Sequence, residues 1–387
     1  MPAILKLSGK SSEEREEYEM GDTMPKLKLA AVQAAPVFLN REASVEKACR
    51  LIHEAGTKGA SFVGFPENFI PGHPVWYHFF PATSPRALDL AVDLFENSVE
   101  VGSDATDALC KAASDANVFV VMGLTERRPG TTGTLFNTQL FIDRRGQIVG
   151  KHQKVVPTVG ERLVHAGGAG DSQGVVVSEW GPVSGLCCGE NSNPFAVGLL
   201  AAQYTRIHVA NWPNHFTPGY HSMAGTSLLA SRNIAYMCKC YVISPCGTIS
   251  SEMVKTLATN EKDRAYLLDP KEGGGSVILD PRAEIIAGPL GGEHEGIIYA
   301  DADLRETIRG RFIHDFGGHY NRTDVFRLLW NDNNPSLVTN ARNRAGIEEA
   351  KDLWTLDADR PAKRTNIRSS NIGSGPNIKS ETPCEED

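Results

Sequence analysis

Apolar residues along this chain gather into short runs that are rich in Val, Ile, Phe and Ala, and several of these runs are apolar throughout. A short apolar run bounded by polar or turn-forming residues predicts a β-strand that is covered on both faces. The runs occupy residues 27–35, 61–65, 118–124, 135–143, 175–180, 183–188, 207–212, 236–244, 276–280 and 296–301. The chain is therefore expected to build a large and deeply buried β-structure.

Between these runs, apolar residues recur at the three- to four-residue spacing of an amphipathic helix. Helices are expected at residues 44–58, 104–117, 193–204 and 220–236. Ser44 is suited to cap the first of them. Turn sequences that begin at Asp143 and Asp280 follow one strand and precede another, so they predict hairpins within the sheets.

About ten strands are too many for one open sheet with so few helices to cover it. We therefore expect an α/β fold in which two mixed sheets pack face to face and the helices lie on the outer faces. Residues 1–25 are expected to be a flexible leader, and residues 26–330 the folded domain. Residues 331–387 form a C-terminal extension, and its polar composition predicts disorder after about residue 357.

Composition narrows the class of protein. The chain has 387 residues, of which 41% are hydrophobic and 22% charged, and its net charge is −8. This balance disfavours nucleic acid and an anionic membrane as partners, because both bind basic patches. No apolar run approaches the ~20 residues that cross a bilayer, and the polar N-terminus lacks the apolar core of a signal peptide. We expect a cytoplasmic protein.

The eight cysteines do not predict disulfides or a zinc site. A reducing compartment disfavours disulfides, and no pair of cysteines has the Cys-x-x-Cys spacing of a zinc site. Most of them are expected to be small buried apolar residues. No metal is expected.

The run at residues 183–188 ends abruptly in two cysteines and a glycine, so it presents a thiol at the end of a strand. Gly189 has no Cβ and permits both a sharp turn and the close approach of a substrate. A helix that begins near Pro194 would direct its N-terminus to this turn, and a nearby cation would further lower the pKa of the thiol. The alternative is a buried structural cysteine.

Two other segments could supply what a reactive thiol needs. Glu67 ends an apolar strand, where it could act as a general base or form a loop salt bridge. Lys154 could stabilise charge on a substrate, or lie on the surface. Glu161 could orient Lys154, or pair with Arg162.

Taken together, these segments resemble the nitrilases of the carbon–nitrogen hydrolase superfamily, and the resemblance covers about residues 26–330. Four ordered motifs carry it: Phe65-Pro66-Glu67, residues 150–158 with Glu161-Arg162, Cys188-Gly189-Glu190-Asn191, and residues 318–325. The resemblance implies a four-layer α-β-β-α sandwich that needs no metal or organic cofactor.

The resemblance also implies roles for individual residues. Cys188, not the adjacent Cys187, would be the nucleophile, because it has the Cys-x-Glu-Asn spacing of the motif. The resemblance makes Glu67 the general base, Lys154 the charge-stabilising lysine and Glu161 the second glutamate.

Three further residues are candidates for binding the substrate or its developing charge. The backbone N–H of Gly189 could stabilise charge, and Trp212 and Tyr77 could form walls of the pocket. The chain departs from the family at Gly189, where tryptophan is usual, and this difference could widen the pocket. It also departs at Gln153, where arginine is usual.

The implied reaction is hydrolysis of a small organic nitrile to a carboxylic acid and ammonia, through a cysteine thioimidate and thioester. The alternatives with the same Glu-Lys-Cys site are an amide-forming nitrile (cyanide) hydratase and an amidase or N-carbamoyl hydrolase. A non-enzymatic thiol sensor that uses the adjacent Cys187 and Cys188 belongs to a different class. The resemblance further implies a homodimer that extends into a larger spiral homo-oligomer.

Overall fold

The computed structural model describes residues 24–215 and 222–334. All of them belong to the first of two compact units, which spans residues 1–334, whereas the second spans residues 335–387. Residues 1–23 of the expected leader and residues 335–387 of the expected extension lie outside the described residues. The domain boundaries drawn from the sequence therefore stay predictions.

The described residues form two mixed six-stranded sheets. The first sheet has the order β12-β1-β2-β3-β4-β5, with bounds Gly296–Asp303, Lys26–Gln33, Phe62–Gly64, Phe119–Arg127, Leu135–Ile142 and Ile148–Gln153. The second has the order β11-β10-β9-β8-β7-β6, with bounds Ile285–Ala287, Val277–Leu279, Tyr241–Ser244, Ile207–Asn211, Gly181–Cys187 and Val175–Ser178. The expected hairpins are confirmed, since β4 and β10 pair antiparallel with β5 and β11.

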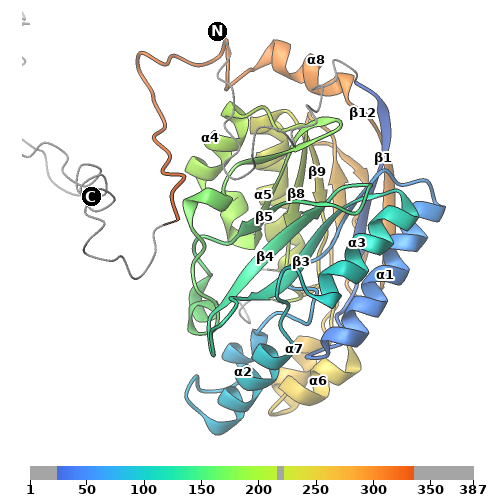
Figure 1. The fold of residues 1–387 in the computed structure, drawn as a ribbon, viewed down its shortest axis with the longest axis vertical. Helices are drawn as coiled ribbons and strands as arrows, with labels where there is room; N and C mark the ends of the chain where they lie inside the picture. Colours follow the sequence, from blue (N-terminus) through green and yellow to red (C-terminus); the bar gives the residue numbers. More distant parts are fainter. Residues whose placement is uncertain (1–23, 216–221, 335–387) are drawn as a thin grey trace, which may run out of the picture. The chain divides into compact units, whose positions relative to one another are not determined.

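Four helices cover the outer faces of the two sheets (Figure 1). On the first sheet lie α1 (Arg41–Thr57) and α3 (Asp104–Ala116), which bury apolar side chains in one core cluster with β1 to β4. On the second sheet lie α4 (Pro194–Ala202) and α5 (Met223–Cys238), which share another cluster with β7 to β10. The expected four-layer sandwich is confirmed.

A third core cluster lies between the sheets. Phe62 and Phe119 of the first sheet stack with their ring centroids 4.7 Å apart and meet Val209 and Ile243 of the second. These side chains are fully buried, and burying such side chains stabilises the fold by about 1.5–3 kcal/mol apiece. The packing between the sheets therefore fixes how the ends of their strands face each other.

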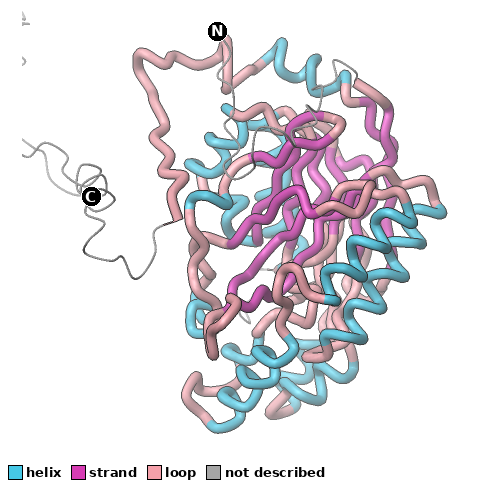
Figure 2. Tube along the Cα trace, viewed as in Figure 1, coloured by secondary structure: helices cyan, strands magenta, loops and turns pink. Residues whose placement is uncertain are grey.

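Residues 24–215 and 222–334 also contain four helices that the sequence analysis did not predict. They are α2 (Pro85–Asn97), α6 (Ser251–Leu257), α7 (Glu261–Leu267) and α8 (Arg305–Ile313). The first three gather at one end of the sandwich, where they share a core cluster (Figure 2). These three helices extend the fold beyond the ends of the sheet strands.

The strand expected at residues 236–244 is partly wrong. Helix α5 continues to Cys238, because Ile234, Ala235 and Cys238 extend its buried stripe. Lys239 then adopts a left-handed conformation (φ 51°) that ends the helix, and β9 begins at Tyr241. The expected start of this helix, at residue 220, lies outside the described residues.

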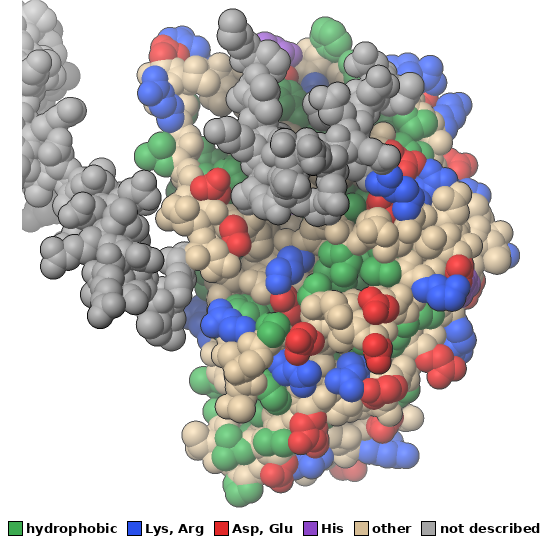
Figure 3. Space-filling view, viewed as in Figure 1, with side chains coloured by type: hydrophobic (Ala, Val, Ile, Leu, Met, Phe, Trp, Pro, Cys, Tyr) green, Lys and Arg blue, Asp and Glu red, His purple; other side chains and the backbone are tan. Residues whose placement is uncertain are grey.

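The surface carries both acidic and basic side chains, as the similar numbers of the two kinds in the sequence lead one to expect. On the face shown in Figure 3, acidic and basic side chains are interspersed. Within residues 24–215 and 222–334, no helix is long and apolar enough to cross a bilayer.

Candidate active site

Glu67 lies in the turn that follows β2, the shortest strand of the first sheet. Its backbone N–H donates to the carbonyl oxygen of Trp212, 3.2 Å away, so the turn is tied to the end of β8 in the second sheet. The carboxylate is buried, and its Oε2 accepts no hydrogen bond from the described residues. A buried carboxylate with one free oxygen is suited to accept a proton.

Lys154 directly follows β5, and its side chain is almost completely buried. Its backbone N–H donates to the carbonyl oxygen of Asn137 on β4 (2.8 Å), which continues the ladder for one residue. The ammonium then binds Glu67 Oε1 at 2.8 Å and Glu161 Oε2 at 2.7 Å. The lysine and both glutamates expected from the sequence therefore meet in one buried cluster.

Glu161 is held by a short 3₁₀ helix, η2 (Val159–Leu163). Its Oε2 also accepts from the Thr158 backbone N–H (2.9 Å), and its Oε1 accepts from His165 Nδ1 (3.1 Å) and from the amide of Asn137 (2.7 Å). The same Asn137 amide donates to Glu67 Oε1. Glu161 pairs with Lys154 and not with Arg162, whose Nε donates to the Pro157 carbonyl.

Cys188 begins the turn at the end of β7 and is buried. Its φ of 48° lies in the left-handed region, which is uncommon for a residue with a Cβ and is concentrated at functional sites. The side chain of Glu190 holds this turn, because its Oε2 accepts the Cys187 backbone N–H at 3.0 Å.

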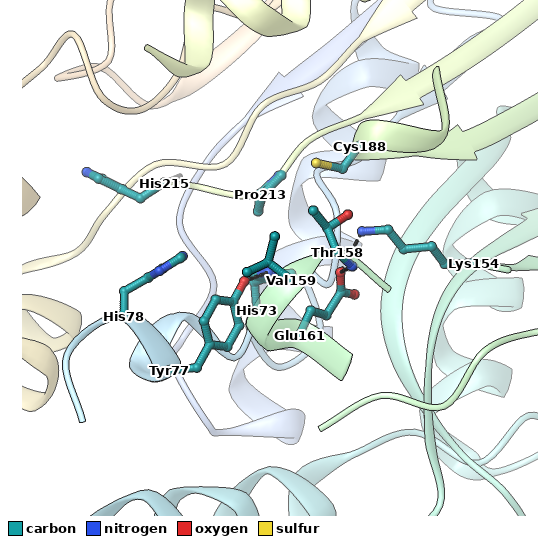
Figure 4. A pocket seen from close by; sticks show the side chains of 10 residues that line it. All are labelled: His73, Tyr77, His78, Lys154, Thr158, Val159, Glu161, Cys188, Pro213 and His215. Carbon is teal, nitrogen blue, oxygen red and sulfur yellow. Dashed lines mark hydrogen bonds and ion pairs between the residues drawn. The ribbon is translucent and has the colours of Figure 1, made fainter. Parts of the chain in front are cut away.

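Lys154, Glu161 and Cys188 line a common cavity of about 40 Å³, and Glu67 reaches its edge through the ion pair with Lys154 (Figure 4). Its lining residues are His73, Tyr77, His78, Lys154, Thr158, Val159, Glu161, Cys188, Pro213 and His215. The sulfur of Cys188 faces the cavity from one side, and the hydroxyl of Tyr77 points into it from another. The cavity can hold the reacting end of a small molecule.

Burial sets the protonation states of the base and the nucleophile. Burial, reinforced by nearby Glu161 and opposed by Lys154, raises the pKa of Glu67 to about 7. Burial also raises the pKa of the Cys188 thiol well above its ordinary value, and Glu67 adds to this effect. The sequence predicted a lowered pKa for this thiol, but the favourable effects of Lys154 and the Gly189 N–H are the smaller ones. The thiol is therefore protonated at rest and needs a base.

Charge pairing sets the protonation states of Lys154 and Glu161. Burial opposes the charge on Lys154, but the two glutamates outweigh it and hold the pKa of the ammonium well above its usual range. Burial likewise opposes the charge on Glu161, but Lys154 and His165 keep the pKa of its carboxyl well below the usual range. Lys154 and Glu161 therefore form the permanently charged part of the cluster.

The three other candidates from the sequence lie in different places. Tyr77 lines the cavity. Gly189 lines a second, larger cavity of about 470 Å³, where a Cβ built on it would meet only Thr158 Oγ1, at 3.5 Å. Trp212 is fully buried and packs in a small core cluster with Cys188. Gln153, at the other departure from the family, donates to Glu126 Oε2 (2.8 Å).

Sequence reasoning missed Asn137, His165 and His73, which contact the glutamates or the cavity. Asn137 left a signal, because it is a polar residue within the otherwise apolar run 135–143. The two histidines left none, since only the folded chain brings them to the site.

Among the described residues, two groups of side chains have ligand atoms close enough to hold a metal ion: His152, Cys187 and Glu190, and Glu67, His73 and Glu161. In the first group, His152 Nε2 and Glu190 Oε2 already bind each other at 2.7 Å. In the second, Lys154 occupies the position between the two carboxylates. Hydrogen bonds and ion pairs within the chain therefore account for both arrangements.

Comparison with known proteins defines the class. The sequence profile of the family Carbon-nitrogen hydrolase matches residues 28–312. The chain is 38% identical to Nitrilase 2 of an unknown prokaryotic organism over 78% of this chain and 91% of the relative. It is 34% identical to a nitrilase of Bacillus sp. (strain OxB-1), over 79% and 88%, and 32% identical to a cyanide hydratase of Aspergillus niger, over 91% and 98%.

Solved structures share the fold at lower identity. The NitFhit protein of C. elegans superposes with a TM-score of 0.59 at 18% identity, covering 81% of this chain and 69% of that one. Nit3 of Saccharomyces cerevisiae gives a TM-score of 0.55 at 20% identity, covering 75% and 94%.

The chain therefore belongs to the carbon–nitrogen hydrolase family and is a hydrolase that acts on carbon–nitrogen bonds. Within this family it falls in the nitrilase branch, as the curated relatives at 34–38% identity indicate.

Proposed function

We propose that this protein is a nitrilase that converts a small organic nitrile to its carboxylic acid and ammonia. The observation that carries the proposal is the buried cluster in which the Lys154 ammonium binds the carboxylates of Glu67 and Glu161 beside the thiol of Cys188. The nitrilases among the relatives support it. The proposed roles are nucleophile for Cys188, general base for Glu67, charge stabiliser for Lys154 and positioning residue for Glu161.

In the first half of the proposed reaction, Glu67 takes the proton from the Cys188 sulfur as the sulfur attacks the nitrile carbon. The electron pair of the broken carbon–nitrogen π bond moves to nitrogen, which takes up the proton and leaves a thioimidate. A base with a pKa of about 7 can both accept and return a proton near neutrality. Glu161, which is already ionised, holds Lys154 in place.

In the second half, Glu67 removes a proton from a water molecule as it adds to the thioimidate carbon. Glu67 returns this proton to nitrogen, which gives a tetrahedral intermediate with a hydroxyl and an amino group. Transfer of the hydroxyl proton to nitrogen by way of Glu67 then expels ammonia and leaves a thioester. A second water, deprotonated by Glu67, adds to the thioester and releases the acid, and Glu67 returns the proton to the sulfur. Lys154 stabilises the negative charge that develops at each addition. The Gly189 N–H assists by favouring the thiolate form of the leaving group.

The amide-forming alternative starts from the same intermediate. If the tetrahedral species expels the thiolate before ammonia, an amide leaves instead of an acid. The cyanide hydratases among the relatives, one of them matched over 98% of its length, favour keeping this reaction as the second candidate. An amidase or N-carbamoyl hydrolase would use the same site on an amide substrate.

A panel of aliphatic, aromatic and arylacetonitriles, together with cyanide and the matching amides, tests the proposal. Acid, amide and ammonia are quantified for each compound. The wild type is expected to release acid and ammonia from nitriles, and Cys188→Ala to lose at least about 10³-fold in kcat. Cys187→Ala, the matched control, is expected to keep most of the wild-type rate because its thiol does not line the cavity.

Full activity in Cys188→Ala would overturn the site assignment. Equal losses in Cys187→Ala and Cys188→Ala, with no product from any nitrile, would favour the thiol-sensor alternative. Release of amide alone would assign the hydratase reaction.

The homo-oligomer expected from the sequence is also a proposal, and exposed apolar side chains support it. Phe195 on α4, Leu229 on α5 and Phe312 on α8 are 71%, 73% and 80% exposed. Large apolar side chains that stay in water on neighbouring elements indicate a surface that another copy covers.

The cytoplasm remains the proposed location, in keeping with the free cysteines among the described residues.

Light scattering coupled to size-exclusion chromatography tests the assembly. Leu229→Asp and Phe312→Asp are expected to shift the protein to smaller species, because each places a charge in the apolar contact. Leu88→Asp, a matched change at a 54% exposed leucine on α2, is expected to leave the size unchanged. A wild type that elutes as a monomer would refute the proposal.

A further inference from the structure

The hydroxyl of Tyr77 points into the cavity and is bound from behind by a buried histidine (Figure 4). His73 Nε2 lies 3.0 Å from the Tyr77 hydroxyl, and His73 Nδ1 lies 2.8 Å from Nδ2 of Asn68. The Thr125 hydroxyl donates in turn to Asn68 Oδ1 (3.3 Å). These contacts run from the cavity into the first sheet and involve no group that the proposed mechanism uses.

The direction of these hydrogen bonds follows from the donors. An amide nitrogen can only donate, so His73 Nδ1 must accept from Asn68. Burial lowers the pKa of His73 to about 3, so the ring is neutral and carries its one proton on Nε2. His73 therefore donates to the oxygen of Tyr77, and the proton of the Tyr77 hydroxyl is left free to point into the cavity.

The ring of Tyr77 is fixed in this orientation. A Cβ built on Gly160 would lie 2.4 Å from Cδ2 of the ring, so only glycine at this position leaves room for it. His78 packs edge-on against the ring with the centroids 4.3 Å apart. Burial, with a contribution from Glu161, raises the pKa of the Tyr77 phenol well above its ordinary value, so the hydroxyl keeps its proton.

The proposed reaction needs a donor of this kind. The tetrahedral intermediate presents a nitrogen, an oxygen and a sulfur, whereas Lys154 already spends two of its three N–H bonds on Glu67 and Glu161. The Gly189 N–H lowers the pKa of the Cys188 thiol, so it serves the sulfur. A further donor that is aimed into the cavity can therefore serve the nitrogen.

We propose that Tyr77 is a catalytic residue that donates a hydrogen bond to the substrate nitrogen, and that His73 is the positioning residue that turns its hydroxyl to the cavity. This inference rests on the proposed nitrile hydrolysis. The hydrogen bond stabilises negative charge on nitrogen when sulfur adds. It also assists the departure of ammonia in the tetrahedral intermediate, so it favours carbon–nitrogen over carbon–sulfur cleavage and acid over amide.

Tyr77→Phe tests this role, because it keeps the ring and removes the donor. We expect kcat to fall about 10²-fold, the scale for one lost transition-state donor, with little change in KM. We also expect the ratio of amide to acid to rise several-fold. Tyr241→Phe is the matched control, because it removes another hydroxyl with a 3.0 Å hydrogen bond, to the Asp303 carbonyl, away from the cavity. It should leave the product ratio unchanged.

The positioning role of His73 has its own readout. His73→Leu should reproduce part of the change in product ratio, and His73→Gln, which can still donate a hydrogen bond, should restore it. In the Tyr77→Phe background, His73→Leu should change the ratio no further, because the two residues act as one unit. If Tyr77→Phe does not fold, 3-fluorotyrosine at position 77, whose more acidic phenol is a stronger hydrogen-bond donor, should shift the product ratio.

The possible failures can be told apart. A wild type that hydrolyses no nitrile, or a fully active Cys188→Ala, refutes the proposed function itself. An active wild type whose product ratio does not respond to Tyr77→Phe or to 3-fluorotyrosine overturns only the inference about Tyr77. A rise in KM without a change in ratio, or a wild type that releases only amide, also overturns it.

Discussion

At the scale of single residues, the site depends on a contrast between two neighbouring acids. Glu161 binds a lysine, a histidine, an asparagine and a backbone N–H, whereas Glu67 keeps one oxygen free of partners among the described residues. Glu161 is therefore held ionised, and Glu67 is left to exchange protons near neutral pH. Two identical functional groups acquire different chemistry from their surroundings alone.

This contrast predicts the pH dependence of the reaction. The basic form of Glu67 is required, so kcat/KM should fall about tenfold for each pH unit below about 7. The histidines His73, His78 and His215, which line the cavity, do not explain such a limb, because burial lowers their pKa values to about 3, about 4 and about 4.

Glu67→Gln is the variant for this measurement. It should lose about 10²–10⁴-fold in rate and show no acid limb near pH 7. Persistence of the limb in Glu67→Gln would assign it to another group.

The chemistry of these residues could be read from the sequence, but their environment could not. Glu67 and Cys188 stand at the ends of apolar runs, and the residue types of Glu67, Lys154 and Cys188 suffice to suggest a thiol hydrolase. Burial raises the pKa of the Cys188 thiol, and the extent of that burial could not be read from the chain before it was folded. Asn137 meets Glu67 across 70 positions of the chain, a contact that no local pattern encodes.

At the scale of elements, one side chain joins the two segments that carry the lysine and the cysteine. Glu190 accepts the backbone N–H of Val155 at 2.8 Å and that of Cys187 at 3.0 Å, and it binds His152 at 2.7 Å. These residues flank Lys154 at the end of β5 and Cys188 at the end of β7, and the two strands belong to different sheets. Glu190 therefore sets the distance between the two catalytic segments.

Removing this carboxylate should cost both stability and rate. Glu190→Ala leaves the buried His152 ring and the buried Cys187 backbone N–H without their carboxylate partner, and it frees the more exposed N–H of Val155. Loss of the buried partner is expected to destabilise the fold by about 3–5 kcal/mol. Urea denaturation measures the loss. Asp324→Asn, which breaks an exposed ion pair with Arg322, is the control and should leave the midpoint unchanged. A normal midpoint for Glu190→Ala would show that the bridge is dispensable.

Long, buried elements were easier to predict from the sequence than short elements or elements that lie outside the sheets. The long strands of both sheets read directly from their apolar runs. Helix α2 was missed although Ser84 caps it and Pro85 opens it, since its buried stripe of Ala87, Leu90 and Leu94 lies outside the sheets. Helices α6 and α7 have seven residues each, too few for a periodic pattern to stand out.

At the scale of the whole molecule, the site lies where the two sheets face each other. The first sheet contributes Glu67 and Lys154 from segments that follow β2 and β5, and the second contributes Cys188 from the end of β7. The apolar runs of the sequence placed Glu67 and Cys188 at strand ends. Their convergence depends on the packing of Phe62 and Phe119 against the second sheet, which becomes visible only in the folded chain.

The reactive groups are divided between the two sheets, so the site is complete only when the two sheets of one chain have packed against each other. Neither sheet carries a complete set of sulfur, carboxylate and ammonium, so a partly folded chain has no means of attacking cellular electrophiles with an activated thiol. The thiol therefore becomes reactive only when the two sheets pack together at the end of folding. Turnover is then the most sensitive gauge of that docking, and it should vanish at denaturant concentrations where circular dichroism still records intact strands.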